Sequence, residues 1–374
     1  MIVADFRFFF MQYSHIFSFI IYKYHSNHIT LYSNNYNTIK MNKSIPIVSV
    51  IVPNYNYAKF LDQRIASILN QTYTNYELIL LDDASTDNSA EVLKKYQDNP
   101  HVSQIIINEH NSGSPFKQWM KGISLAKGEW VWIAEADDLC APTFLETCMR
   151  YIEMDKGNTS ICNVGSVYID SKGKNIDRAV QTWEKNEKQV SAISFDGKKF
   201  AEFILYWSNK VPNASGVVFR REYALRIQDP TWTTMRYCGD WLFWFEMVLQ
   251  GNAIQVYKIL NYFRIHNSQT SKGISSGQNI VESLKVALYI RKKIPSIGYD
   301  KSRQKYGREA RIIRHLKDKA IQNKIKKEYQ QMLHSSFLKN YLYYKLHRHL
   351  RFLPMISSEE KEKKKALKYS RILE

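Results

Sequence analysis

Residues 49–85, SVIVPNYNYAKFLDQRIASILNQTYTNYELILLDDAS, decide the fold because two apolar runs flank a segment with helical periodicity. The runs at 49–56 and 77–85 are short and rich in aliphatic residues, which is typical of buried strands. Between them, apolar residues recur at helical spacing at Leu61, Ile65, Ile68 and Leu69. A strand–helix–strand unit of this length predicts two parallel strands joined by a crossover helix.

The same alternation continues downstream. Strands are predicted over 102–110 and 129–138, with a helix between them. In the less regular part that follows, we expect strands over 160–170 and 252–266, and helices near 199–207 and 240–250. The prediction is therefore an α/β fold with a mainly parallel sheet flanked by helices. In such a sheet, ligands bind at the carboxyl ends of the strands.

Composition and charge limit the possible classes of protein. The 374 residues are 44% hydrophobic and 24% charged, which is typical of a folded chain and excludes disorder as its main state. The formal net charge is +18, and residues 301–374 contribute most of it, with 21 Lys and Arg against 7 Asp and Glu. We therefore expect residues 286–374 to form a basic helical region. Its charges either line solvated helix faces or bind an anionic membrane surface.

Three parts of the chain are expected. Residues 1–40 are aromatic but interrupted by polar residues, and they contain no run of about 18 apolar residues that could span a membrane. Met41 begins a segment that leads directly into the first strand, so we expect residues 1–40 to be upstream sequence outside the native protein, or to be disordered. Residues 41–285 are predicted to form the α/β domain, which the basic region follows.

Polar clusters follow three of the predicted strands, at 52–57 (VPNYNY), 80–86 (LLDDAST) and 134–142 (AEADDLCAP). One such cluster is as readily explained by a turn, but three at the same sheet edge indicate a site. The sequence contains neither GxGxxG after the first strand nor a GxxxxGK[ST] loop to hold phosphate. The adjacent acids Asp137 and Asp138 would repel a phosphate group, so they can hold one only through a divalent cation. Mg²⁺ is usually bound in this way, by one or two carboxylates together with phosphates of the substrate.

VPNYN, LLDDAST and AEADD, in this order and followed by a proline, resemble the motifs of family 2 glycosyltransferases of the GT-A fold. The resemblance is specific over residues 46–150, and 211–225, 238–244 and 262–271 are similar to later parts of bacterial members. It implies a nucleotide-sugar half at 41–150 and an acceptor half at 151–285. The implied reaction is the metal-dependent, inverting transfer of a sugar from a nucleotide-diphospho-sugar to an acceptor hydroxyl, in the synthesis of bacterial surface polysaccharide or lipopolysaccharide.

The resemblance also implies roles for single residues in donor binding. Pro53, Tyr55 and Asp83 would hold the nucleotide base, with Tyr55 stacking on the ring and Asp83 accepting a hydrogen bond from it. Asp137 would contact the ribose or the metal, and Asp138 would coordinate Mn²⁺ or Mg²⁺ that bridges the diphosphate. Taken singly, these residues also fit structural roles at a strand end or a turn.

Two later residues complete the implied site. Asp240 is expected to be the base that takes the proton from the acceptor hydroxyl, although it could simply cap the following helix. His266 resembles a histidine that reaches the metal or the diphosphate in some members, but a histidine at a strand end is often structural. Lys117, Gln118 and Trp119 lie where this chain departs from the motif of many relatives, so no donor contact is assigned there.

The expected partners are the sugar donor, a glycan or lipid-linked glycan acceptor and an anionic membrane surface, but not nucleic acid. Four cysteines without a CxxC pair predict reduced thiols and a cytoplasmic protein, peripheral at the inner face of the membrane. A sugar nucleotidyltransferase and a basic nucleic-acid-binding protein are the alternatives. The first lacks its glycine-rich phosphate loop and the second lacks a recognisable binding module. A glycosyltransferase-like protein without activity is disfavoured because all three candidate aspartates are present.

Overall fold

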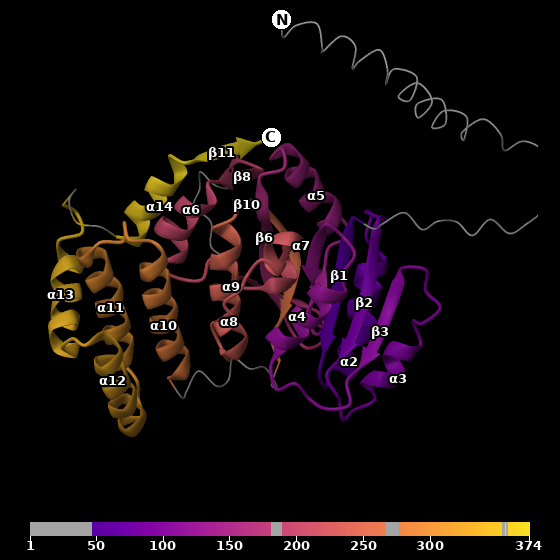
Figure 1. Ribbon diagram of the computed structural model, residues 1–374, viewed down its shortest axis with the longest axis horizontal. Coiled ribbons are helices and arrows are strands. Elements are labelled where there is room, and N and C mark those ends of the chain that lie inside the picture. The colour runs from indigo at the N-terminus through magenta and orange to yellow at the C-terminus, as the bar shows by residue number, and fades with distance from the viewer. Residues whose placement is uncertain (1–46, 181–188, 267–276, 354–355, 357) are drawn as a thin grey trace, which may run out of the picture. The chain divides into compact units, whose positions relative to one another are not determined.

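One mixed β-sheet connects the N-terminal and C-terminal parts of the described chain (Figure 1). The computed structural model describes residues 47–374 except 181–188, 267–276, 354–355 and 357, so the expectation for residues 1–40 lies outside the described residues. All described residues belong to a single unit, Ile45–Glu374. Its strands are β1 (Val48–Asn54), β2 (Tyr76–Asp82), β3 (Val102–Ile107), β4 (Trp130–Ile133), β5 (Leu139–Cys140), β6 (Thr159–Ile169), β7 (Asn175–Ala179), β8 (Ala192–Phe195), β9 (Val217–Arg220), β10 (Asn252–Arg264) and β11 (Ser370–Leu373).

The helices between the strands are mostly short, and after β10 five helices, α10 to α14, precede the last strand in the described part of the chain. Helix α6 leads directly into a π-helix, η2, and a 3₁₀ turn, η3, precedes β9. The helices are α2 (Ala58–Leu69), α3 (Ser89–Lys94), α4 (Pro115–Leu125), α5 (Phe144–Met154), α6 (Gly197–Phe200), η2 (Ala201–Leu205), η3 (Ala214–Gly216), α7 (Arg221–Leu225), α8 (Thr231–Thr234), α9 (Gly239–Val248), α10 (Gln278–Lys293), α11 (Tyr299–Arg314), α12 (Lys319–Leu333), α13 (Phe337–His349) and α14 (Glu359–Leu367).

The strand order is β11-β8-β10-β6-β9-β4-β1-β2-β3, with β5 paired to β10 and β7 to β6. Strands β3, β2, β1 and β4 are parallel, as are β6 and β10, whereas β9 runs antiparallel to both of its neighbours, β4 and β6. The predicted α/β fold class with flanking helices is confirmed. The antiparallel strand β9 joins the two parallel groups, and the sequence pattern did not indicate this connection.

Helices cover both faces of the sheet, because alternate residues of the central strands enter two separate cores. Ile51 packs with residues of α4 and α9, whereas its neighbours Val50 and Val52 pack with residues of α2 and α5. All seven residues of β1 and all seven of β2 are buried. Strands that are buried on both faces read as continuous apolar runs, which explains why the sequence pattern located them.

The basic C-terminal region is helical and packs against the rest of the unit. The predicted boundary at residue 286 falls within α10, and helices α10 to α13 share a small core around Leu284, Ile313 and Tyr329. After α14 the chain returns to the sheet, where β11 pairs antiparallel with β8. There Arg371 donates to the buried carboxylate of Asp155 at 2.9 Å. The last residues of the chain therefore complete the edge of the sheet.

Glycine at position 307 allows α11 and α13 to approach closely. A Cβ atom at Gly307 would lie 2.3 Å from the backbone oxygen of Asn340 and 2.4 Å from Cβ of Tyr344. We expect Gly307→Ala to lower the free energy of unfolding by about 2 kcal/mol, because the two helices must separate. Gly298→Ala is the matched control, since a Cβ there meets no atom within 4 Å. Urea denaturation of both variants checks this, and equal stability of the two would contradict the close packing.

All four cysteines are free and buried. Within the described ranges, no helix has both the length and the apolar character needed to cross a bilayer.

Candidate active site

The three polar clusters of the sequence meet at one edge of the sheet. In the parallel pairing, Asn54 of β1 lies opposite Asp82 of β2, and Ile51 lies opposite Ile133, the last residue of β4. The strands therefore end side by side, and the segments after them, including Glu135 to Asp138, continue from the same edge. The predicted meeting of the clusters is observed.

Asp82 ties the first two clusters together. Its carboxylate accepts hydrogen bonds from Asn54 Nδ2 at 2.7 Å and from the Ser85 backbone N–H at 2.8 Å. Asn56, with φ at 61°, accepts from the backbone N–H of Thr86 at 2.7 Å through its Oδ1 atom. Asparagine tolerates this left-handed conformation better than most residues. These side chains were not among the predicted site residues, because their partners lie about 30 positions away along the chain.

The predicted base-binding residues differ in exposure. Pro53 is buried near the end of β1, whereas the Tyr55 side chain is among the exposed large hydrophobic residues, at 45% exposure. Asp83 is buried, and its Oδ1 atom accepts from Asn108 Nδ2 and Gln118 Nε2, both at 2.7 Å.

Ser112 completes the environment of Asp83. Its backbone N–H donates to Oδ1 at 2.9 Å, and its hydroxyl donates to Oδ2 at 2.7 Å. Oδ1 therefore receives three hydrogen bonds and Oδ2 receives one. A carboxylate oxygen has two lone pairs, so Oδ2 keeps acceptor capacity for a further donor.

Strand β10 delivers the second half of the site to the acidic pair. Tyr262 of β10 pairs antiparallel with Leu139 of β5, the residue directly after Asp138. This register places Arg264 and His266 beside the two aspartates. His266 Nε2 lies 2.8 Å from Asp137 Oδ2. The sequence-predicted residues Asp137, Asp138 and His266 are thus brought together.

Asp138 is the more deeply enclosed of the two acids. Its side chain is 1% exposed, and its two oxygens accept from the Arg264 backbone N–H at 2.9 Å and from Asn213 Nδ2 at 3.1 Å. Burial and the charge of Asp137 raise the pKa of Asp138 to about 7, against the opposing charge of Arg64. Asp138 therefore cross-links the loop after β4 to β10 and to the segment before η3.

Asp137 is less enclosed than Asp138, with 13% of its side chain exposed, and one of its carboxylate oxygens has no partner among the described residues. Oδ2 contacts His266, while Oδ1 has no hydrogen bond within the part of the chain that the structure describes. The backbone oxygen of Asp137 accepts from Arg264 Nε at 2.6 Å, which fixes the loop. Among the described residues, Asp137 is thus the acid with an unpaired oxygen and with an imidazole nitrogen beside it.

The Asp137–His266 pair fits a divalent cation. Carboxylate oxygen suits Mg²⁺ and Mn²⁺, while the imidazole nitrogen favours a transition metal, so the donor set fits Mn²⁺ better than Mg²⁺. Among the described residues, no three His, Cys, Asp or Glu side chains are grouped as a complete metal site. Two protein ligands leave room for oxygens of a diphosphate and for water, as in many nucleotide sites.

Glu135 and Trp119 form a further contact at this edge. Trp119 Nε1 of α4 donates to Glu135 Oε1 at 2.9 Å. Burial and the neighbouring Asp137 charge raise the pKa of Glu135 to about 8, although the Trp119 hydrogen bond opposes the rise. Helix α4, for which the sequence analysis assigned no donor contact, therefore contacts both acids: Gln118 donates to Asp83, and Trp119 donates to Glu135.

Asp240 lies in the first turn of α9, and the chain around it is fixed by side chains from elsewhere. Asn209 Nδ2 donates to Asp240 Oδ2 at 2.8 Å. The turn before α9 is held by Glu282 of α10, whose carboxylate accepts from the backbone N–H groups of Tyr237 and Cys238 at 2.7 and 2.9 Å. Burial raises the pKa of Asp240 to about 7, although hydrogen bonds from Trp241 and Asn209 oppose the rise. The N-cap position of α9 is occupied by Cys238, and Asp240 is the second residue of the helix.

The sequence is similar to that of known bacterial glycosyltransferases. Residues 49–245, more than half of the chain, match the family described as Glycosyl transferase family 2. The chain is 37% identical over 129 residues to glycosyltransferase GlyG of Streptococcus pneumoniae, covering 34% of this chain and 42% of that protein. It is 27% identical over 263 residues to an uncharacterized glycosyltransferase of Nostoc sp., covering 67% and 77% of the two chains.

A third relative is the poly(ribitol-phosphate) beta-N-acetylglucosaminyltransferase TarP of Staphylococcus aureus, 35% identical over 137 residues, with 36% of this chain and 40% of that protein covered. The chain thus spans less than half the length of GlyG and of TarP. Among solved structures, TarS of S. aureus in complex with UDP-GlcNAc aligns over 70% of this chain and 80% of its own, at 16% identity and a TM-score of 0.49. On the family match, which spans more than half of its residues, this chain belongs to glycosyl transferase family 2.

Proposed function

We propose that this chain is a nucleotide-sugar-dependent glycosyltransferase that transfers its sugar with inversion, with a divalent metal held by Asp137 and His266. The observation that carries the proposal is the 2.8 Å contact between Asp137 Oδ2 and His266 Nε2. It lies at the strand edge where ligands of α/β sheets bind, and Asp137 lies within the segment that matches the family.

The two proposed metal ligands, Asp137 and His266, do not include Asp138, which the sequence analysis expects to coordinate the metal. Both oxygens of Asp138 already accept hydrogen bonds from protein groups. We assign to Asp138 the role of positioning Asp137 and Arg264, and to Asp137 and His266 the direct contact. A divalent cation bound there supplies the positive charge that stabilises the departing diphosphate.

For donor binding we keep the predicted residues. Tyr55 offers an exposed ring for stacking, and Asp83 Oδ2 can accept a hydrogen bond from the N–H of a pyrimidine ring. The hydrogen bonds that Gln118, Asn108 and Ser112 donate to the Asp83 carboxylate fix it in one orientation. Because TarP is named as an N-acetylglucosaminyltransferase, UDP-N-acetylglucosamine is the first donor to test.

Asp240 is the proposed base. The acceptor oxygen attacks the anomeric carbon from the side opposite the diphosphate, the bond to the diphosphate breaks, and the acceptor proton passes to the Asp240 carboxylate. A carboxylate with a raised pKa is a stronger base than an ordinary aspartate, so the burial of Asp240 suits this role.

The raised pKa of Asp240 predicts a pH dependence. The base must be deprotonated, so kcat should fall about tenfold per pH unit below pH 7 and level off above it. Asn209→Ala removes a hydrogen bond that favours the charged carboxylate, which should move the midpoint to higher pH. A kcat profile from pH 5 to 9 of the wild type and Asn209→Ala checks this. An unchanged midpoint in the variant would contradict the assignment of Asp240.

We infer a glycan or lipid-linked glycan acceptor, in the synthesis of bacterial surface polysaccharide or lipopolysaccharide, because the named relatives are bacterial glycosyltransferases. The basic C-terminal region would attract an anionic membrane surface and place the enzyme, peripheral and cytoplasmic, at the inner face. The family match argues against the nucleotidyltransferase and nucleic-acid-binding alternatives.

The proposed activity is tested with a panel of nucleotide-diphospho-sugars. Each donor is incubated with the full chain and Mn²⁺, and the released nucleoside diphosphate is measured, with Mg²⁺ and EDTA as parallel conditions. We expect release with at least one UDP-sugar, faster with Mn²⁺ than with Mg²⁺ and abolished by EDTA. Undiminished release in EDTA would refute the metal dependence.

A further inference from the structure

A cavity of about 680 Å³ lies where the C-terminal helices meet the acceptor half of the enzyme. Residues of η2, the segment 207–212, α11, α13 and α14 line it. The lining contains five Lys and Arg side chains and two Glu side chains, together with the aromatic rings of Phe203, Trp207 and Tyr344. This volume is in the range of small-molecule sites, and the lining combines positive charge with aromatic surface.

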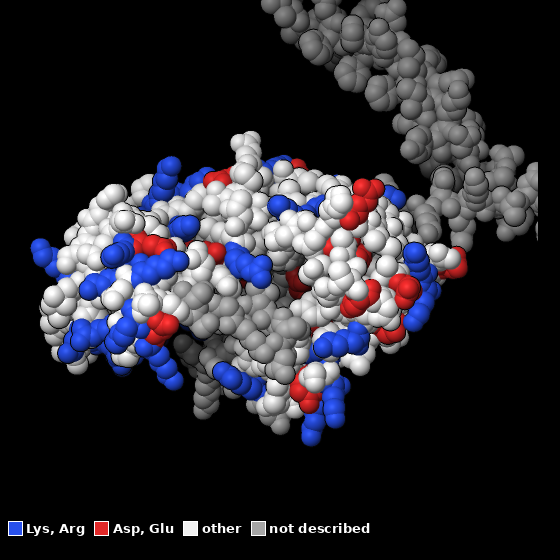
Figure 2. All heavy atoms as spheres, turned by 90° about the horizontal axis from the view of Figure 1, so that it is seen from below, with Lys and Arg blue, Asp and Glu red and all other residues white. Residues whose placement is uncertain are grey.

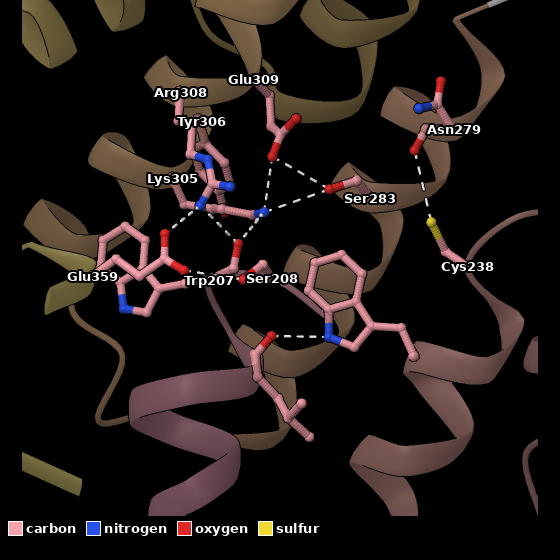
Figure 3. A network of polar contacts seen from close by, with 12 residues as sticks. Trp207, Ser208, Cys238, Asn279, Ser283, Lys305, Tyr306, Arg308, Glu309 and Glu359 are labelled. Atoms are coloured by element: carbon pink, nitrogen blue, oxygen red, sulfur yellow. Dashed lines mark hydrogen bonds and ion pairs between the residues drawn. The ribbon is translucent and has the colours of Figure 1, made fainter. Parts of the chain in front are cut away.

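Helix α11 holds one wall of the cavity in place. The backbone oxygen of Trp207 accepts from Lys305 Nζ at 2.8 Å and from Arg308 Nη1 at 3.2 Å, as Figure 3 shows. Lys305 is 1% exposed and forms an ion pair with Glu309 at 2.8 Å. A buried lysine held by a carboxylate and a carbonyl is fixed in position, so the adjoining wall is fixed as well.

Helix α14 is joined to the same wall by ion pairs. Glu359 lies 2.9 Å from Lys210 Nζ and 2.9 Å from Arg308 Nη1, and it accepts from the Ser208 hydroxyl at 3.1 Å. One of the two acids in the lining is therefore neutralised by two of the five cations.

Two cations of the lining, Arg348 of α13 and Arg351 just after it, are not used in this way. Neither Arg348 nor Arg351 forms an ion pair or a side-chain hydrogen bond with any described residue, and both are exposed. Trp207 Nε1 is buried without a hydrogen-bond partner among the described residues. Figure 2 shows Lys and Arg gathered over the C-terminal helices, whereas Asp and Glu are more frequent over the N-terminal part. The cavity thus presents free donors for an anion.

The cavity wall is also part of the active site. Lys210 and Pro212 line the cavity, while the flanking residues Asn209 and Asn213 donate to Asp240 and Asp138. Three residues of the segment 209–213 therefore line the cavity, and its two end residues donate to the two carboxylates. A group bound in the cavity would lie next to the proposed base.

We propose that this cavity binds a phosphate group of the acceptor, with Arg348 and Arg351 as its ligands. The inference rests on the proposed function, because it takes the bound molecule to be the acceptor of the sugar. Arginine side chains bind phosphate through paired N–H donors, and the aromatic rings suit the sugar units beside it. The phosphate belongs either to a soluble phosphodiester polymer or to the head group of a lipid carrier.

The test measures binding of two probes to the full chain in EDTA. Inorganic polyphosphate represents the soluble source, and phosphatidylcholine vesicles with or without phosphatidylglycerol represent the lipid source. The test variant is Arg348→Glu with Arg351→Glu. The control is Lys324→Glu with Lys327→Glu, which makes the same charge change on exposed residues of α12 outside the cavity.

We expect the arginine variant to bind at least one probe about tenfold or more weakly than the wild type, and the lysine variant to stay within about twofold. Loss confined to polyphosphate supports a soluble acceptor, and loss confined to anionic vesicles supports a lipid head group. Equal weakening in both variants, or no binding of either probe by the wild type, overturns the proposal. Mn²⁺-dependent binding of UDP is measured in parallel, so that a failure at the cavity is distinguished from a failure of the donor site.

Discussion

Replacing Asp137 by asparagine should lower kcat by about 10³-fold and abolish Mn²⁺-dependent binding of the donor. Asp137 is the one carboxylate among the two proposed metal ligands, and one of its oxygens has no partner among the described residues. The change removes the negative charge that would hold the cation. The amide is nearly the same size as the carboxylate, and Asp137 is less enclosed than Asp138, so the fold should tolerate it. The rate of nucleoside diphosphate release gives kcat. Calorimetric titration with UDP, with and without Mn²⁺, gives the metal-dependent affinity.

Asp138→Asn is the matched control for this prediction. Both oxygens of Asp138 accept from N–H groups, so an amide must point its NH₂ group at one of these donors. We therefore expect Asp138→Asn to lower the free energy of unfolding by about 2 kcal/mol, while Asp137→Asn changes it by less than about 1 kcal/mol. If Asp137→Asn kept normal Mn²⁺-dependent binding and Asp138→Asn lost it without loss of stability, the metal would belong to Asp138.

Asp240→Asn should lower kcat by about 10²-fold to 10⁴-fold and leave the affinity for the donor within about threefold. The amide can still pair with Asn209 after a side-chain rotation but cannot take the proton of the acceptor. The measurement is a comparison of transfer rate with UDP-sugar binding by calorimetry, at a pH above 8, where the wild-type base is deprotonated.

Two results would separate a base from a structural residue at this position. Asp240→Glu restores a carboxylate and should recover part of the activity, whereas a helix-capping role would be served equally by asparagine. Near-normal transfer by Asp240→Asn would show that another group takes the proton.

The sequence predicted the N-terminal half of the fold well, for a physical reason. Strands β1, β2 and β4 are buried on both faces, so their apolar runs are continuous and easily located. Their parallel pairing follows from the helices between them, and it brings Asn54, Asp83 and Asp137 to one edge. The site residues of this half could be proposed because they follow the strands directly.

The sequence pattern gave no sign of the connections made by distant residues. Strand β11 has only four residues and exists because it pairs with β8, some 175 residues earlier in the chain. Asn213 contacts Asp138 across 75 positions, and Gln118 contacts Asp83 across 35. The spacing of apolar residues along the chain does not indicate which distant residues will pair. Their only signal in the sequence was that polar residues stand in otherwise apolar or turn segments.

The central claim is that Asp137 and His266 bind the metal that stabilises the departing diphosphate. It is tested most directly by anomalous diffraction at the manganese edge from crystals soaked with Mn²⁺ and UDP. The account predicts a single strong peak within bonding distance of an Asp137 carboxylate oxygen and of His266 Nε2. Bound UDP whose diphosphate lies at this sheet edge with no such peak, or with a peak ligated by other residues, would contradict it.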